Sequence, residues 1–148
     1  MRAALLALML SFATQAGAEC GKLCDYDWWK TATVADVQAE LDAGANIMAR
    51  TENGATPIHS TARRVFPDNI IALLDAGAEV MVRDKYGKTP LYWAAQSGTP
   101  VTTQALLDGG ADAKAKDKNG KTPWDLAYTN EKLKGTKAYR ALNDAQYN

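Results

Sequence analysis

An exact period of 33 residues runs through most of this chain. Four features recur at that step: Gly44, Gly77 and Gly110; Gly54, Gly87 and Gly120; Thr56-Pro57, Thr89-Pro90 and Thr122-Pro123; and Leu41-Asp42, Leu74-Asp75 and Leu107-Asp108. Features that share one phase indicate a structural repeat, in which each unit is too short to bury its own apolar face. The sequence therefore predicts a row of units that stack on one another.

Each unit predicts a turn followed by two helices. The turn dipeptides are Asn53-Gly54, Tyr86-Gly87 and Asn119-Gly120, since glycine adopts a positive φ without steric cost. Threonine then caps a first helix with proline as its first residue, expected over 57–64, 90–97 and 123–130. Apolar residues at helical spacing predict second helices that begin at Pro67 and Pro100 and end before Gly77 and Gly110.

These units resemble the ankyrin repeat. The closest matches are Thr56-Pro57-Ile58-His59 and Leu73-Leu74-Asp75-Ala76-Gly77-Ala78, followed by Thr89-Pro90-Leu91-Tyr92-Trp93-Ala94-Ala95 and Leu106-Leu107-Asp108-Gly109-Gly110-Ala111. The resemblance implies an all-α fold, a short ankyrin-repeat solenoid of helix-turn-helix units joined by β-turn fingers. We expect an N-terminal capping repeat over 19–52, ankyrin repeats over 53–85 and 86–118, and a C-terminal capping repeat over 119–148.

The two ends depart from the repeat as caps should. At the N-terminal end, Thr33 and Asp36 predict a capped helix over 34–42, and Trp28 and Trp29 stand where the repeat has small residues. We expect the two rings to cover the apolar face of the first repeat. At the C-terminal end, a lysine-rich stretch replaces the Leu-Leu-x-x-Gly-Ala pattern, which predicts a solvated outer face.

The first 18 residues have the layout of a secretory signal peptide. A positive start is followed by the apolar run over residues 3–13 and by a small-residue site ending at Ala18. A membrane anchor is disfavoured because the run is far shorter than the roughly 20 residues that span a bilayer, and a lipoprotein is disfavoured because Glu19 precedes Cys20. We expect export, to the periplasm of a Gram-negative bacterium or otherwise to the medium, and no membrane span after cleavage.

Export would place the only two cysteines, Cys20 and Cys24, in an oxidising compartment. They can close a small disulfide ring that staples the start of the domain. The alternative is a dithiol redox centre, but such centres separate their cysteines by two residues and this chain by three.

Little in the sequence favours catalysis. His59 is the only histidine, so the usual Cys/His metal sites are nearly excluded, and we expect no metal, no cofactor and no enzyme. The resemblance implies that His59 bonds local backbone and hydroxyl groups; the alternative is a general base. Asp84 and Asp117 begin turns, where a carboxylate accepts backbone N–H groups. The formal net charge of zero disfavours nucleic acid as a partner.

What remains is a binding surface for another protein. In ankyrin proteins the turn tips and the exposed face of the first helices form that surface. Carried over to this chain, the positions are Asn53, Ala55, Ser60, Arg63, Arg64, Lys85, Tyr86, Lys88, Trp93, Gln96, Ser97, Lys118, Asn119 and Lys121. Tyr86, Trp93 and the arginine pair belong to the residue types that dominate binding energy. The alternatives are burial of Trp93 between helices and simple solvation of the arginine pair.

The charges are zoned along the chain. Residues 19–48 carry six acids and two bases, whereas residues 113–140 carry eight bases and three acids. The basic end can steer an acidic partner, or the zoning is ordinary surface variation. We therefore expect a monomeric interaction module; the alternatives are an inhibitor or immunity factor that blocks a cell-envelope enzyme, and, less favoured, a hydrolase or redox enzyme.

Overall fold

The computed structural model describes residues 21–148. The predicted signal peptide (1–18) and Cys20 lie outside them, so export and the Cys20–Cys24 pairing stay predictions. The described part folds into helices and turns without a strand, which confirms the predicted all-α solenoid. None of its helices is long and apolar enough to cross a bilayer.

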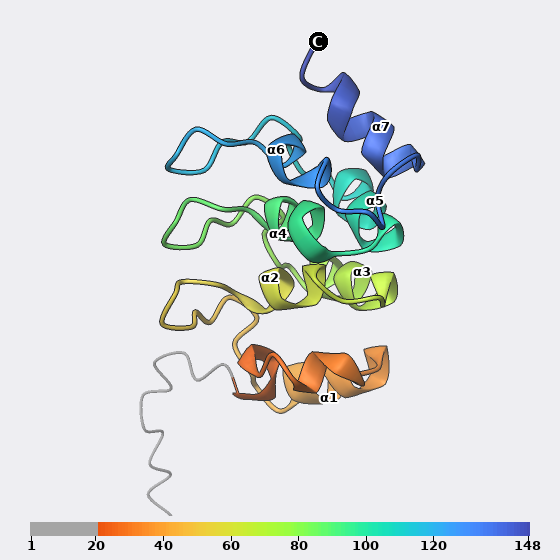
Figure 1. The fold of residues 1–148 in the computed structure, drawn as a ribbon. Helices are drawn as coiled ribbons and strands as arrows, with labels where there is room; N and C mark the ends of the chain where they lie inside the picture. Colours follow the sequence, from red (N-terminus) through yellow and green to blue (C-terminus); the bar gives the residue numbers. More distant parts are fainter. Residues whose placement is uncertain (1–20) are drawn as a thin grey trace, which may run out of the picture.

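The helices form two stacked layers with fingers beside them (Figure 1). The first layer contains α2 (Pro57–Ala62), α4 (Pro90–Ser97) and α6 (Trp124–Ala127), and the second contains α1 (Val34–Asp42), α3 (Pro67–Asp75), α5 (Pro100–Asp108) and α7 (Lys137–Asp144). Two short 3-10 helices, η1 (Gly21–Cys24) and η2 (Trp28–Lys30), precede α1. The segments 43–56, 76–89 and 109–123, here called the fingers, project from the side of the first layer.

The predicted capping residues set the starts of the helices. The Thr33 hydroxyl accepts from the backbone N–H of Asp36, and the Asp36 carboxylate accepts from the backbone N–H of Thr33, which is the expected capping box. Gly77 and Gly110 follow the ends of α3 and α5 with φ of 98° and 91°, the left-handed conformation that glycine adopts without strain.

The core lies between the two layers. Ile58 and Leu91 from the first layer meet Ile70, Leu73 and Leu106 from the second, and all five are fully buried. Burial of each such side chain contributes about 1.5–3 kcal/mol, so this shared interior is what holds neighbouring units together. Small side chains in the first layer let its helices approach closely, namely Ala62, Ala94, Ala95 and Ala127.

Both ends of the core are closed by side chains of the caps. Trp29 is fully buried, and its indole Nε1 donates to the Leu23 carbonyl oxygen at 2.8 Å. Trp28 packs against the same core, and the more specific expectation that the two rings cover the first repeat stays a prediction. At the other end Leu133 and Leu142, the latter on α7, are fully buried.

Two first-layer helices are shorter than predicted. The helix expected over 57–64 ends at Ala62, and Arg63 is its C-cap. The helix expected over 123–130 spans only Trp124–Ala127. There Asn130 leaves the helical path, and its amide donates to the carbonyl oxygens of Ala95 and Gly98.

Candidate binding surface

The finger tips carry most of the predicted contact residues. Tyr86 is 54% exposed, Lys88 is half-buried, and the other exposed members are Asn53, Lys85, Lys118, Asn119 and Lys121. Gln96 and Ser97, on α4, are exposed as well. The fingers themselves project from one side of the stack (Figure 1).

Consecutive fingers are tied to each other by a repeated set of hydrogen bonds. The Arg50 guanidinium donates to the carbonyl oxygens of Gly54 and Arg83, and Arg83 repeats the pattern toward Gly87 and Lys116. Backbone bonds of 3.0 Å also join Lys85 N to Asn53 O and Lys118 N to Tyr86 O. The tips are thus held at fixed separations.

A hollow of about 300 Å³, here called the concave hollow, lies between the first finger and the first layer. Its lining residues are Cys24, Tyr26, Thr51, Asn53, Ala55, Ser60, Arg63 and Trp93. Ala55 and Ser60 are only 3% and 4% exposed, so these two predicted contact residues form its floor and offer a partner little surface. The taller side chains around them supply the walls.

Trp93 is neither buried between helices nor free in solvent. It is half-buried, and its indole Nε1 donates to Asp84 Oδ2 at 3.0 Å. Its ring meets the His59 ring edge to face at 5.3 Å, and the Arg63 guanidinium lies 4.4 Å from its centroid. The ring is therefore fixed on one side while it lines the hollow on the other.

The arginine pair is not a solvated helix end. Arg63 Nη2 donates to Gln96 Oε1 at 3.1 Å while its guanidinium stacks on Trp93. Arg64 lies 3.7 Å over the Tyr26 ring and donates to the Tyr26 carbonyl oxygen. Arg63 thus lines the hollow while stacked on Trp93, and Arg64 lies next to the hollow, stacked on the lining residue Tyr26.

Sequence reasoning did not include Tyr26 among the contact residues. It precedes the residues that follow the 33-residue period, so no repeat position marks it. The one available signal is its place beside Trp28 and Trp29 in the aromatic N-terminal cap.

His59 is a structural residue, as predicted. It is fully buried, and its Nδ1 lies 3.1 Å from both the backbone N and the hydroxyl of Thr56. Its Nε2 lies 3.0 Å from the Lys88 carbonyl oxygen, which ties α2 to the next finger. With both ring nitrogens engaged and no exposed surface, the imidazole is not placed to serve as a general base.

Burial lowers the pKa of His59 below its ordinary value of 6.5, against the opposing effect of the hydrogen bond to Lys88. The unfolded chain therefore takes up a proton before the folded chain does. The free energy of unfolding is expected to be steady above about pH 7 and to fall as the pH drops below about 6.5. Urea unfolding between about pH 7.5 and 5.5 measures this. Because there is one histidine, a His59→Gln variant should lose the slope, and an unchanged slope in that variant contradicts the assignment.

Asp84 and Asp117 organise their turns, as predicted. One oxygen of Asp84 accepts the N–H groups of Tyr86 and Lys88, and Asp117 repeats this with Asn119 and Lys121. The second oxygen of Asp117 accepts from the Tyr92 hydroxyl at 3.0 Å. Burial, together with that hydrogen bond, raises the pKa of Tyr92 to about 12. Both carboxylates thus accept hydrogen bonds that stabilise the fingers.

Residues 21–148 contain no group of three or more His, Cys, Asp or Glu side chains arranged to hold a metal ion. A comparison with curated proteins finds none that matches this chain. A family model described as ankyrin repeats in three copies matches residues 33–117 and, in an overlapping match, residues 66–140. Together the two matches span well over half of the sequence. The chain belongs to the ankyrin-repeat family.

Proposed function

We propose that this chain is an exported module that binds one protein through its finger tips and its concave hollow. Ankyrin repeats generally mediate interactions between proteins, and proteins built from them are typically binding modules rather than enzymes. The observation that carries the proposal is the hollow itself, which Tyr26, Arg63 and Trp93 line, with Arg63 stacked on Trp93 and the neighbouring Arg64 stacked on Tyr26. Export rests on the signal-peptide pattern of residues 1–18.

The mechanism is presentation by a rigid scaffold. Hydrogen bonds from Arg50 and Arg83 fix one finger to the next, and Trp93 is fixed by Asp84. A partner that docks on side chains already in place loses less conformational entropy in forming the complex.

The charges of this surface favour an acidic partner. Lysines predominate at the second and third tips. The carboxylates of Asp84 and Asp117 there accept hydrogen bonds from backbone N–H groups. Arg63, which lines the hollow, and Arg64, which stacks on Tyr26, add two half-buried guanidinium groups of the same sign. A carboxylate of the partner matches the geometry of a guanidinium, and opposite charge speeds association.

The variants Tyr86→Ala and Trp93→Ala test the proposal. Each removes an aromatic ring of the kind that dominates interfaces, and we expect each to weaken the captured complex by roughly 2 kcal/mol, about 30-fold in Kd. The measurement is pull-down with cross-linking from the compartment where the protein resides, followed by titration of the purified partner.

Tyr147→Ala is the matched control, since Tyr147 is 80% exposed and lies at the C-terminal end rather than at a finger. Because Trp93 also contacts Asp84 and Arg63, circular dichroism must first show that its variant is folded. Unweakened capture by both folded variants means that the partner does not use this surface.

A further inference from the structure

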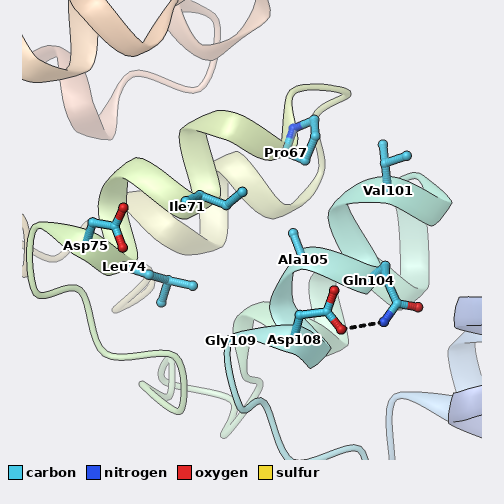
Figure 2. A pocket seen from close by; sticks show the side chains of 9 residues that line it. All are labelled: Pro67, Ile71, Leu74, Asp75, Val101, Gln104, Ala105, Asp108 and Gly109. Atoms are coloured by element: carbon cyan, nitrogen blue, oxygen red, sulfur yellow. Dashed lines mark hydrogen bonds between the residues drawn. The ribbon is translucent and has the colours of Figure 1, made fainter.

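A second hollow, of about 510 Å³, lies between α3 and α5 in the second layer, which is the layer away from the fingers (Figure 1). Figure 2 shows its lining residues: Pro67, Ile71, Leu74, Asp75, Val101, Gln104, Ala105, Asp108 and Gly109. We call it the back groove. Ile71 and Val101 are 48% and 51% exposed, so two branched apolar side chains face solvent beside it.

Both of these side chains depart from the repeat. One period earlier and one period later, the position of Ile71 holds Gln38 and Gln104. The position of Val101 holds Ala35 in the first unit and an aspartate in the second. The repeat pattern therefore does not by itself require this apolar surface. The surface arises because two positions that differ from the other units both lie beside one groove.

A third departure widens the same groove. Gly109 stands where the two preceding units have Ala43 and Ala76. A Cβ at Gly109 would come within 2.6 Å of the Leu74 Cδ1 atom. The glycine thus leaves room for Leu74 to lie along the groove, between the two helices.

Carboxylates bound the groove at the ends of both helices. Asp75 is the last residue of α3 and Asp108 the last of α5, and both are exposed. The last turns of α3 and α5 contain no basic residue, and no basic residue lines the groove. The partial negative charge at a helix C-terminus adds to theirs. Gln104 Nε2 donates to Asp108 Oδ1 at 2.7 Å (Figure 2), while its Oε1 accepts no hydrogen bond from the described residues.

We propose that the back groove binds an amphipathic helix of a partner protein. Apolar side chains of that helix fill the groove against Ile71, Leu74 and Val101, and its Lys or Arg side chains pair with Asp75 and Asp108. Packed helices lie about 8–10 Å apart and a helix rises about 1.5 Å per residue, so a helix that crosses α3 and α5 places its basic residues about five to seven positions apart. This site is separate from the concave hollow, and its partner has the opposite charge.

A synthetic helical peptide tests the proposal directly. It carries leucines along one face and two lysines seven positions apart beside that face; a second peptide has glutamate in place of both lysines. We expect the full chain to bind the lysine peptide, measured by fluorescence anisotropy at low salt, and the glutamate peptide to lose at least about tenfold in affinity.

The matched variant is I71Q/V101A, in which both positions take residues that the other units hold there, so the fold and the charge are preserved. It should lose about tenfold or more in affinity for the lysine peptide, since it removes most of the apolar wall. Val65→Thr is the control, because Val65 is exposed and apolar but does not line the groove.

Three results would overturn the proposal: no binding of the lysine peptide by the wild-type chain, equal affinity in I71Q/V101A, or equal affinity for the glutamate peptide. Sedimentation of the protein alone tests whether a second copy of this chain occupies the groove. If the wild-type chain dimerises and I71Q/V101A does not, the groove is a contact between copies of this chain instead. A Tyr86→Ala variant should bind the lysine peptide normally, so failure here is separable from failure of the concave surface.

Discussion

Replacing Trp29 with alanine is expected to lower the free energy of unfolding by about 3–5 kcal/mol. The ring is fully buried at the N-terminal end of the core and contacts Trp28 edge to face at 4.8 Å. Its removal leaves a cavity under the cap and also leaves the Leu23 carbonyl oxygen without its indole donor. Since domains of this size are stable by about 5–15 kcal/mol, the loss is a large part of the total.

Urea unfolding followed by circular dichroism measures this loss without relying on tryptophan fluorescence. A Trp29→Phe variant should fall between the wild type and Trp29→Ala, because it keeps most of the apolar volume but not the N–H donor. Tyr147→Ala, at an exposed aromatic residue, should change stability by less than about 0.5 kcal/mol. If Trp29→Ala loses less than about 1 kcal/mol, Trp29 does not close the core.

The second large effect is expected at Gly98, the first of the two residues between α4 and α5. Its φ of −75° is open to any residue, so the constraint is space and not backbone conformation. A Cβ there would come within 2.5 Å of the Ala62 carbonyl oxygen and 2.7 Å of the Ala94 carbonyl oxygen. Both neighbours are backbone atoms of first-layer helices and cannot rotate away. We expect Gly98→Ala to lose about 3 kcal/mol, the upper end for overpacking, as α2 and α4 are forced apart.

Gly44→Ala separates this steric effect from the ordinary effect of replacing a glycine. Gly44 has a φ of 92° and open space around the position of a Cβ, so only the left-handed conformation is penalised, by about 1–2 kcal/mol. The midpoint temperature of thermal unfolding should therefore be lower for Gly98→Ala than for Gly44→Ala. The reverse order would mean that the helices at Gly98 yield easily to the added methyl group.

The repeat itself could be predicted from the sequence because its signals are local. Turn glycines, Thr-Pro starts and helical spacing act within a few residues, and the structure confirms the second helices and the capping box at Thr33. The end of α6 at Ala127 was harder to predict, because it depends on the tertiary bonds of Asn130 to the preceding unit. Helix limits that neighbouring units impose leave no local signal.

The candidate surface also has features that local sequence determines and features that depend on tertiary contacts. Exposure of the tips follows from the turns, so Tyr86 could be predicted. The pairing of Arg64 with Tyr26 joins residues 38 positions apart across the cap, and no periodic feature connects them. Likewise, Ala55 and Ser60 occupy contact positions of the repeat, but the walls of the hollow rise around them and leave them as its floor.

The central claim is that this chain recognises a protein through its finger tips and concave hollow. Photo-cross-linking tests it most directly, with a photoreactive residue placed in turn at Tyr86 and at Gln96, and in control variants at Gln38 and at Tyr147. We predict that the first two positions cross-link to one and the same protein and that the two controls do not. Cross-links to that protein from the control positions alone would contradict the claim.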